Sequence, residues 1–113
     1  MDYKLIPLKE LVEYLMENKG KDVGFTLDTE EDVEIQGEPQ GWYGAKIDNT
    51  FDGNDFMIGD YGVGIIFISS MLEPPSSFSD YMDLMKEFFA DEGSREMGDD
   101  DLVYVWAEDL EGR

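Results

Sequence analysis

The stretch "DDDLVYVWAEDLEGR", residues 99–113, places the apolar strand LVYVWA between acids on both sides. Successive side chains of a strand point to opposite faces, so Val103 and Val105 share one face while Tyr104 and Trp106 share the other. We expect the two valines to face the core and the two aromatic residues to be at least partly accessible. A few charges protect a strand edge from aggregation. Six flanking acids exceed that need and point to a surface that binds a partner.

A helix is predicted directly upstream of this strand. Ser77 followed by Asp80 resembles a capping box in which Asp replaces Glu, and Gly93 is typical of a helix end. The apolar residues between these signals form one stripe at helical spacing: Phe78, Met82, Met85 and Phe89.

A second amphipathic helix is predicted near the N-terminus. Pro7 suits its first helical position and Gly20 suits its C-terminal stop. Between them the apolar positions recur at helical spacing: Leu8, Leu11, Val12, Leu15 and Met16.

Strand patterns fill the region between the two predicted helices. They cover residues 23–27, 33–36 and 42–48 and the stretch "FMIGDYGVGIIFISS" (56–70), which holds one or two strands. The run Ile65–Ile68 has no polar break, so we expect it to be the central strand, covered on both faces.

The strand over residues 42–48 has two possible inward faces. One consists of Tyr43, Ala45 and Ile47, and the other of Trp42, Gly44 and Lys46. We favour the first because it leaves Lys46 in water.

Together these elements predict an α+β fold, because strands and helices do not alternate over a long stretch. We expect one domain spanning residues 1–113, with a mainly antiparallel sheet of four to five strands and two helices in the order α-β-β-β-β-α-β. A chain of this length can bury one core and should have a radius of gyration of about 13 Å. The expected core residues are Leu11, Leu15, Phe25, Ile65, Phe67, Met85, Phe89, Val103 and Val105.

The residue types that the sequence lacks exclude much of catalysis. There is no cysteine and no histidine, which removes disulfides, thiolate metal sites, the commonest general base near neutral pH and the usual Ser-His and Cys-His nucleophile pairs. We therefore expect no catalytic residue, no metal and no cofactor, with an enzyme as a minor alternative. The N-terminus "MDYKLIPLKE" has no signal-peptide pattern and no apolar run reaches the roughly 18 residues of a membrane span, so a cytoplasmic location is expected.

The segment "DNTFDGND" partly resembles a calcium-binding loop. Asp48, Asp52 and Gly53 match positions one, five and six of the EF-hand pattern. However, Thr50 stands at position three and Gly59 at position twelve, where a bidentate Glu is required. An acidic hairpin turn is therefore the favoured interpretation, and a calcium-binding domain is a minor alternative.

The net charge is the most unusual property of the chain. Asp and Glu number 28 against 8 Lys and Arg, a formal net charge of −20 at pH 7, and self-repulsion on this scale opposes compactness. Tyr and Trp often anchor interfaces, and the carboxylates around them can pair with arginine. The residues expected to bind a partner are Asp28, Glu30, Glu31, Asp32, Glu34, Glu38, Asp99, Asp100, Asp101, Tyr104, Trp106, Glu108 and Asp109.

In size and composition the whole chain resembles the small acidic anti-CRISPR and antirestriction proteins of phages and mobile elements, with "DTEEDVEIQGE" and "DDDLVYVWAEDLE" as its densest acidic stretches. The resemblance implies a non-catalytic inhibitor that mimics nucleic-acid charge. Such an inhibitor occupies the DNA- or RNA-binding site of a basic partner, for example a CRISPR or restriction nuclease, and binds neither nucleic acid nor membranes itself. The alternatives are an acidic module that binds some other basic protein and a salt-adapted protein, although the composition gives no clear halophile signature.

Overall fold

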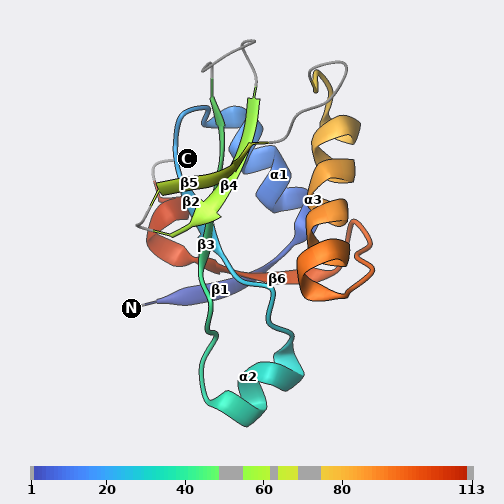
Figure 1. Cartoon of the computed structure of the whole chain (residues 1–113). Helices are drawn as coiled ribbons and strands as arrows, with labels where there is room; N and C mark the ends of the chain where they lie inside the picture. Colours follow the sequence, from blue (N-terminus) through green and yellow to red (C-terminus); the bar gives the residue numbers. More distant parts are fainter. Residues whose placement is uncertain (1, 49–54, 62–63, 69–74, 112–113) are drawn as a thin grey trace.

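The fold consists of one antiparallel sheet with two helices packed over one of its faces and a third helix set apart from both (Figure 1). The computed structural model describes residues 2–48, 55–61, 64–68 and 75–111. In chain order the elements are β1 (Tyr3–Pro7), α1 (Leu8–Glu17), β2 (Val23–Phe25), α2 (Glu30–Gln36), β3 (Tyr43–Asp48), β4 (Asp55–Asp60), β5 (Gly64–Ile68), α3 (Phe78–Gly93), β6 (Leu102–Trp106) and the 3-10 helix η1 (Ala107–Leu110). The predicted α+β class is confirmed.

The sheet has the strand order β1-β6-β2-β3-β4-β5, and each neighbouring pair is antiparallel. Strand β6 lies between β1 and β2, with Tyr104 opposite Leu5 and Val105 opposite Phe25. The strands nearest the two ends of the chain are therefore neighbours. The prediction of a mainly antiparallel sheet is confirmed, and the predicted strand over residues 102–107 is present with Ala107 already in η1.

Two strands differ from the prediction. β1 was missed, because a five-residue segment that runs straight into a helix becomes a strand only through its pairing with β6. The expectation that Ile65–Ile68 is the central strand is wrong, since β5 lies at one end of the strand order and pairs with β4. A continuous apolar run does not by itself place a strand at the centre of a sheet.

The two predicted amphipathic helices are confirmed as α1 and α3. Ser77 and Asp80 form the capping box that opens α3, and Ser94 ends that helix in the left-handed conformation directly after Gly93. The described residues nevertheless contain three α-helices where two were expected, because residues 33–36 belong to α2 and not to a strand. Among the same residues the sheet has six strands where four to five were expected, and the predicted order α-β-β-β-β-α-β is wrong, because β1 precedes α1 and α2 lies between β2 and β3. Within the described ranges, none of the helices combines the length and the apolar character that crossing a bilayer requires.

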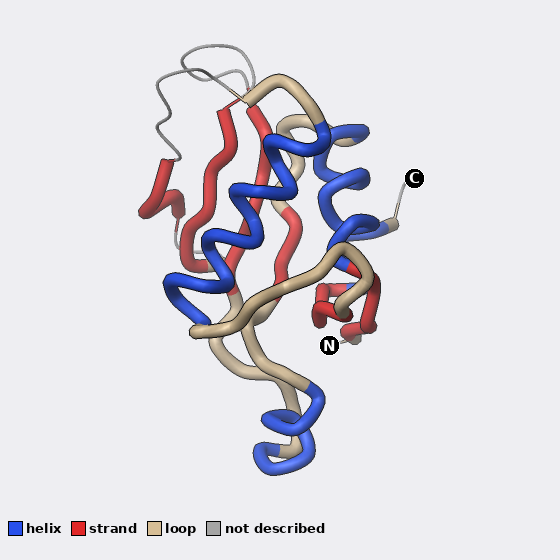
Figure 2. The backbone as a smooth tube through the Cα atoms, turned by 90° about the vertical axis from the view of Figure 1, so that its right-hand side faces the viewer, coloured by secondary structure: helices blue, strands red, loops and turns tan. Residues whose placement is uncertain are grey.

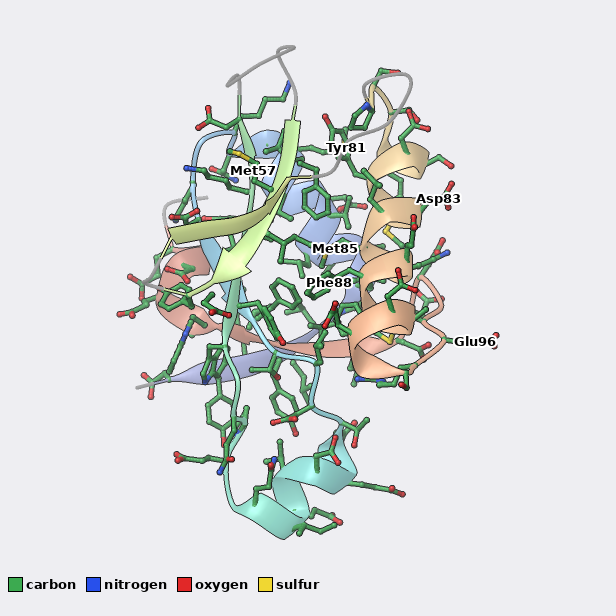
Figure 3. All side chains as sticks on the ribbon, in the orientation of Figure 1. Met57, Tyr81, Asp83, Met85, Phe88 and Glu96 are labelled. Carbon is green, nitrogen blue, oxygen red and sulfur yellow. The ribbon has the colours of Figure 1, made fainter. Side chains whose placement is uncertain are left out.

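The core lies between α1, α3 and the sheet. Met85 and Phe88 point from α3 toward the sheet (Figure 3). Asp83 on the same helix and Glu96, which follows the helix, point outward. The ring of Phe25 on β2 lies 5.8 Å from that of Phe89 and 6.0 Å from that of Phe88. The predicted core residues that are confirmed as buried are Leu11, Leu15, Phe25, Met85, Phe89, Val103 and Val105.

The remaining predictions about the core can be settled in part. Ala45 and Ile47 are buried in the core and Tyr43 packs against it, so the favoured inward face of β3 is confirmed. The side chains of Ile65 and Phe67 lie outside the described residues. The radius of gyration of 13.3 Å agrees with the expected value.

The opposite face of the sheet carries a second group of rings, which we call the outer aromatic cluster: Tyr3, Trp42, Tyr61, Tyr104 and Trp106. Trp42 stacks on Trp106 with 4.0 Å between ring centroids, and Tyr3 meets Tyr104 edge-on at 5.5 Å. Consequently Tyr104 and Trp106 are only 7% and 5% exposed. The expectation that they are accessible is wrong, because rings from distant parts of the chain cover them.

Gly24→Ala is expected to lower the free energy of unfolding by about 1–3 kcal/mol, the usual cost of overpacking a tight contact. A Cβ at Gly24 would overlap the indole Cδ1 of Trp106, and Trp42 is stacked on that indole, so the ring has little freedom to move. Urea denaturation of the variant and the parent chain measures the difference.

The matched control is Gly44→Ala, which changes the residue paired with Gly24 on the neighbouring strand. A Cβ at Gly44 would meet its nearest neighbour, Cδ2 of Tyr61, at an ordinary 3.5 Å. This variant should therefore unfold close to the parent, and equal losses in the two variants would contradict the proposed overlap.

Candidate acidic interface

The most prominent acidic feature is the segment that connects β2 to β3, which we call the acidic arm (residues 28–40). It contains α2 and projects beyond the sheet, away from α1 and α3 (Figures 1 and 2). The arm holds six acids, Asp28, Glu30, Glu31, Asp32, Glu34 and Glu38, and the sequence has no lysine or arginine between Lys21 and Lys46. The first predicted acidic block is thus one structural unit.

Hydrogen bonds at both ends of α2 explain why this part of the chain is helical. The Oγ1 of Thr29 accepts a hydrogen bond from the Asp32 N–H at 3.1 Å, and the Oδ2 of Asp32 accepts one from the Thr29 N–H at 2.8 Å. This is a complete capping box. At the other end Gly37 takes the left-handed conformation, with φ 90°, and donates its N–H to Val33 at 2.7 Å. The alternating pattern at residues 33–36 predicted a strand wrongly because these caps decide the local structure.

Asp28 closes the base of the arm. Its Oδ2 accepts hydrogen bonds from the backbone N–H of Gln40 at 2.7 Å and from the side chain of Gln36 at 3.1 Å. These bonds connect the start of the arm to its end across α2. Asp28 therefore holds the arm in shape, and its carboxylate is already engaged within the arm.

The capping role of Asp32 also lowers its pKa below the ordinary value of 3.8. The backbone hydrogen bond from Thr29 is the main cause, and the Thr29 hydroxyl and the positive charge of Arg95 add to it. A depressed folded-state pKa stabilises the folded arm above the unfolded pKa. That contribution is lost as the pH falls through the lower folded value.

The glutamates of the arm behave differently from its two aspartates. Glu30, Glu31, Glu34 and Glu38 are all exposed. In the part of the chain that the structure describes, none of them forms an ion pair with a lysine or arginine. These four carboxylates therefore face solvent without a direct ion-pair partner among the described residues.

The second acidic block, Asp99 to Asp101, is exposed but is bound to the rest of the fold. Lys86 pairs with Asp99 at 2.7 Å and Lys9 with Asp100 at 2.8 Å. The hydrogen bond to Asp100 is the main cause that raises the pKa of Lys9, and the one to Asp99 does the same for the pKa of Lys86. The Asp101 carboxylate accepts the Gly98 N–H at 2.6 Å and closes the turn.

The backbone of this turn caps α1. The Leu8 N–H donates to the carbonyl of Asp101 at 2.8 Å, and the Lys9 N–H donates to the carbonyl of Asp99 at 3.0 Å. These are the first N–H groups of α1, which have no partner inside the helix. The run of three aspartates is therefore a structural turn as well as an acidic surface.

The two acidic blocks meet around a surface hollow of about 410 Å³. It is lined by Thr29, Glu30, Glu31, Arg95, Asp100, Asp101 and Leu102. Arg95 is held in place by a hydrogen bond from Nη1 to the carbonyl of Leu27 at 3.1 Å and by its position over the ring of Phe89. Carboxylates about 70 positions apart in the sequence thus share one surface. We call it the acidic face, and its carboxylates are those of Glu30, Glu31, Asp100 and Asp101.

The last predicted site residues divide between the surface and the interior. Glu108 is exposed on η1, whereas Asp109 is directed inward. Its Oδ2 accepts the Gly24 N–H at 2.8 Å and the Tyr61 hydroxyl at 3.0 Å. Burial, followed by the hydrogen bond to Asp109, raises the pKa of Tyr61 to about 12. Asp109 therefore supports the outer aromatic cluster.

No metal site emerges from the described ranges, in which no three acids are grouped closely enough to hold an ion. Of the residues compared with a calcium loop, Asp48 pairs with Lys46, with 3.7 Å between Oδ2 and Nζ, and Gly59 lies within β4. Thr50, Asp52 and Gly53 lie outside the described residues.

No protein-family model, curated protein or solved structure matches the chain, so the acidic face is defined by geometry and charge alone. The prediction missed Arg95, which lines the hollow, and Ile35, which lies on α2. Ile35 was counted within a strand, and the spacing of Thr29 and Asp32 is the signal that would have placed it on a helix.

Asp109→Asn is expected to lower the pKa of Tyr61 from about 12, because it removes the charge that the hydroxyl faces, while burial keeps the pKa above 10. NMR titration of the Tyr61 side chain measures this. Since the folded pKa is raised, the stability of the parent chain should fall as the pH rises from about 10 to about 12.

Tyr61→Phe is the control, because it removes the titrating hydroxyl and should make that part of the pH profile less steep. An unchanged Tyr61 pKa in Asp109→Asn would show that the carboxylate does not act on the phenol.

Proposed function

We propose that this protein is a non-catalytic acidic inhibitor that occupies the DNA- or RNA-binding site of a basic partner by mimicking nucleic-acid charge. The observation that carries the proposal is the acidic arm, in which the capped helix α2 and the residues after it expose four glutamates, none of them in an ion pair among the described residues. A site that binds nucleic acid presents lysine and arginine to phosphates. Carboxylates held on a preformed scaffold can pair with the same side chains.

The dimensions of the molecule support this proposal. Duplex DNA carries one charge per about 1.7 Å of its axis, so twenty charges correspond to roughly 34 Å of duplex. The formal net charge is −20 and the longest of the principal extents, 41 × 29 × 25 Å, is similar to that length. In length and in net charge the protein is therefore comparable to a short duplex.

A CRISPR or restriction nuclease is the partner that the resemblance in size and composition favours. Inhibition of such a nuclease would take place in the cytoplasm. Inhibition by occupation requires no reacting group, in agreement with a sequence that lacks histidine and cysteine. The charge of the protein would also speed its encounter with a basic channel.

The deciding experiment is affinity capture from a lysate of the host, with and without added duplex DNA or RNA, followed by mass spectrometry. A captured nucleic-acid-binding protein that the polymer displaces supports the proposal. A captured protein that the polymer leaves bound would favour the acidic protein-binding module instead.

Replacing the four exposed glutamates of the arm by glutamine should weaken binding to that partner by about tenfold at 0.1 M salt, and it should reduce the salt dependence of the affinity. The substituted residues are Glu30, Glu31, Glu34 and Glu38. Titration calorimetry at several salt concentrations measures both quantities.

The control variant also replaces four exposed glutamates by glutamine, so its net charge changes by the same amount. These residues lie on α1 and α3: Glu10, Glu13, Glu87 and Glu92. The control variant should retain most of the affinity. Equal weakening in the two variants would mean that net charge alone, and not the arm, determines binding.

The purified protein should not shift DNA or RNA in a gel at physiological salt, because phosphate repels a body of net charge −20. Binding to a duplex at micromolar concentration would contradict the proposed mimicry. A basic nucleic-acid-binding protein tested in the same gel confirms that the assay detects binding.

A further inference from the structure

Ile35 on α2 is the most exposed large apolar side chain of the described residues. It is 85% exposed, compared with 41% for Leu102 and 37% for Tyr3. Burying an isoleucine side chain is favourable, and this one gains little of that stabilisation within the chain. The exposure is not due to a loose chain end, because capping hydrogen bonds hold α2 on both sides of it.

The surroundings of Ile35 are acidic. Glu31 precedes it by four positions and so lies on the same side of the helix, and Glu34 is its neighbour in sequence. No residue of α2 is buried. The helix therefore offers an exposed apolar side chain with carboxylates beside it, on an element that contributes no buried residue to the core.

This arrangement matches that of an interface hot spot, in which a desolvated anchor is surrounded by polar contacts. The charge of the arm restricts what can cover it. A second copy of this chain would bring equally acidic surfaces together, whereas a basic surface is complementary. An apolar pocket within that basic surface would accept the isoleucine.

We propose that α2 is the docking element of this protein, with Ile35 inserted into an apolar pocket of a basic, nucleic-acid-binding groove and Glu31 and Glu34 paired with lysine or arginine at the rim of that pocket. The inference rests on the function proposed above and adds an apolar anchor to it. Charge mimicry alone would be shared by any acidic surface. The anchor gives the arm selectivity for one groove.

The two kinds of contact predict different kinetic effects. Exposed charges act mainly on the association rate and its salt dependence, whereas a desolvated apolar anchor acts mainly on the dissociation rate. The caps and the Asp28 hydrogen bonds hold the arm in its shape before binding. Less conformational entropy is then lost when the arm docks.

The first part of the test identifies what the arm touches. A photo-crosslinking benzoylphenylalanine is placed at position 35 of the full chain, and at the exposed position 13 of α1 as a control, in the host lysate with and without duplex DNA. The proposal expects a crosslink from position 35, and not from position 13, to a nucleic-acid-binding protein, and it expects DNA to abolish that crosslink.

The second part uses the crosslinked protein after its purification. Ile35→Ser should raise its dissociation rate by about tenfold or more, leaving the salt dependence of association unchanged, and Ile35→Leu should restore slow dissociation. Thermal unfolding of both variants should match the parent, because α2 buries no side chain in the core.

The outcomes separate this inference from the function on which it rests. If Ile35→Ser dissociates like the parent while the arm variant with four glutamines is weakened, the anchor is refuted and the charge mimicry stands. If crosslinks from position 35 persist in excess DNA, or arise equally from position 13, the docking proposal fails. If neither position crosslinks to a nucleic-acid-binding protein although affinity capture retains one, the docking proposal alone fails, and if affinity capture retains none either, both proposals fail.

Discussion

The pairing of β6 with both β1 and β2 is the interaction on which the rest of the structure depends. It joins strands from the two ends of the chain and gives β6 two buried faces, with Val103 and Val105 in the core and Trp106 within the outer aromatic cluster. The turn before β6 supplies the carbonyls that cap α1. A register shift of one residue would exchange the two faces and remove both sets of contacts.

The charge of −20 constrains how this sheet can be assembled. Where the turn of three aspartates must lie against helices, Lys9 and Lys86 pair with two of its carboxylates. In the arm, no lysine or arginine of the described residues pairs with the glutamates. Repulsion costs least there, because water and salt screen exposed charges over about 8 Å at physiological ionic strength. Two of the few cations of the chain thus offset the charge of the turn that caps α1.

The sequence predicted the elements whose local pattern agrees with their tertiary surroundings. The periods of α1 and α3 and the inward face of β3 are of this kind. β1 and the burial of Trp106 could not be read locally, because each depends on a partner more than 60 positions away. α2 is different, since Thr29 and Asp32 have the same spacing as Ser77 and Asp80, which correctly predicted the start of α3. The alternation of residues 33–36 outweighed that signal.

The two acidic residue types have separate tasks in the candidate site, and side-chain length explains the division. The short aspartate side chain reaches nearby backbone N–H groups, and Asp28, Asp32 and Asp101 all accept such bonds. The longer glutamate side chains of the arm make no such bond in the described residues and extend into solvent. A seven-residue helix is marginal alone, so the aspartates stabilise the scaffold from which the glutamates and Ile35 project. Counting acids by charge alone therefore overstates the surface that is free to bind.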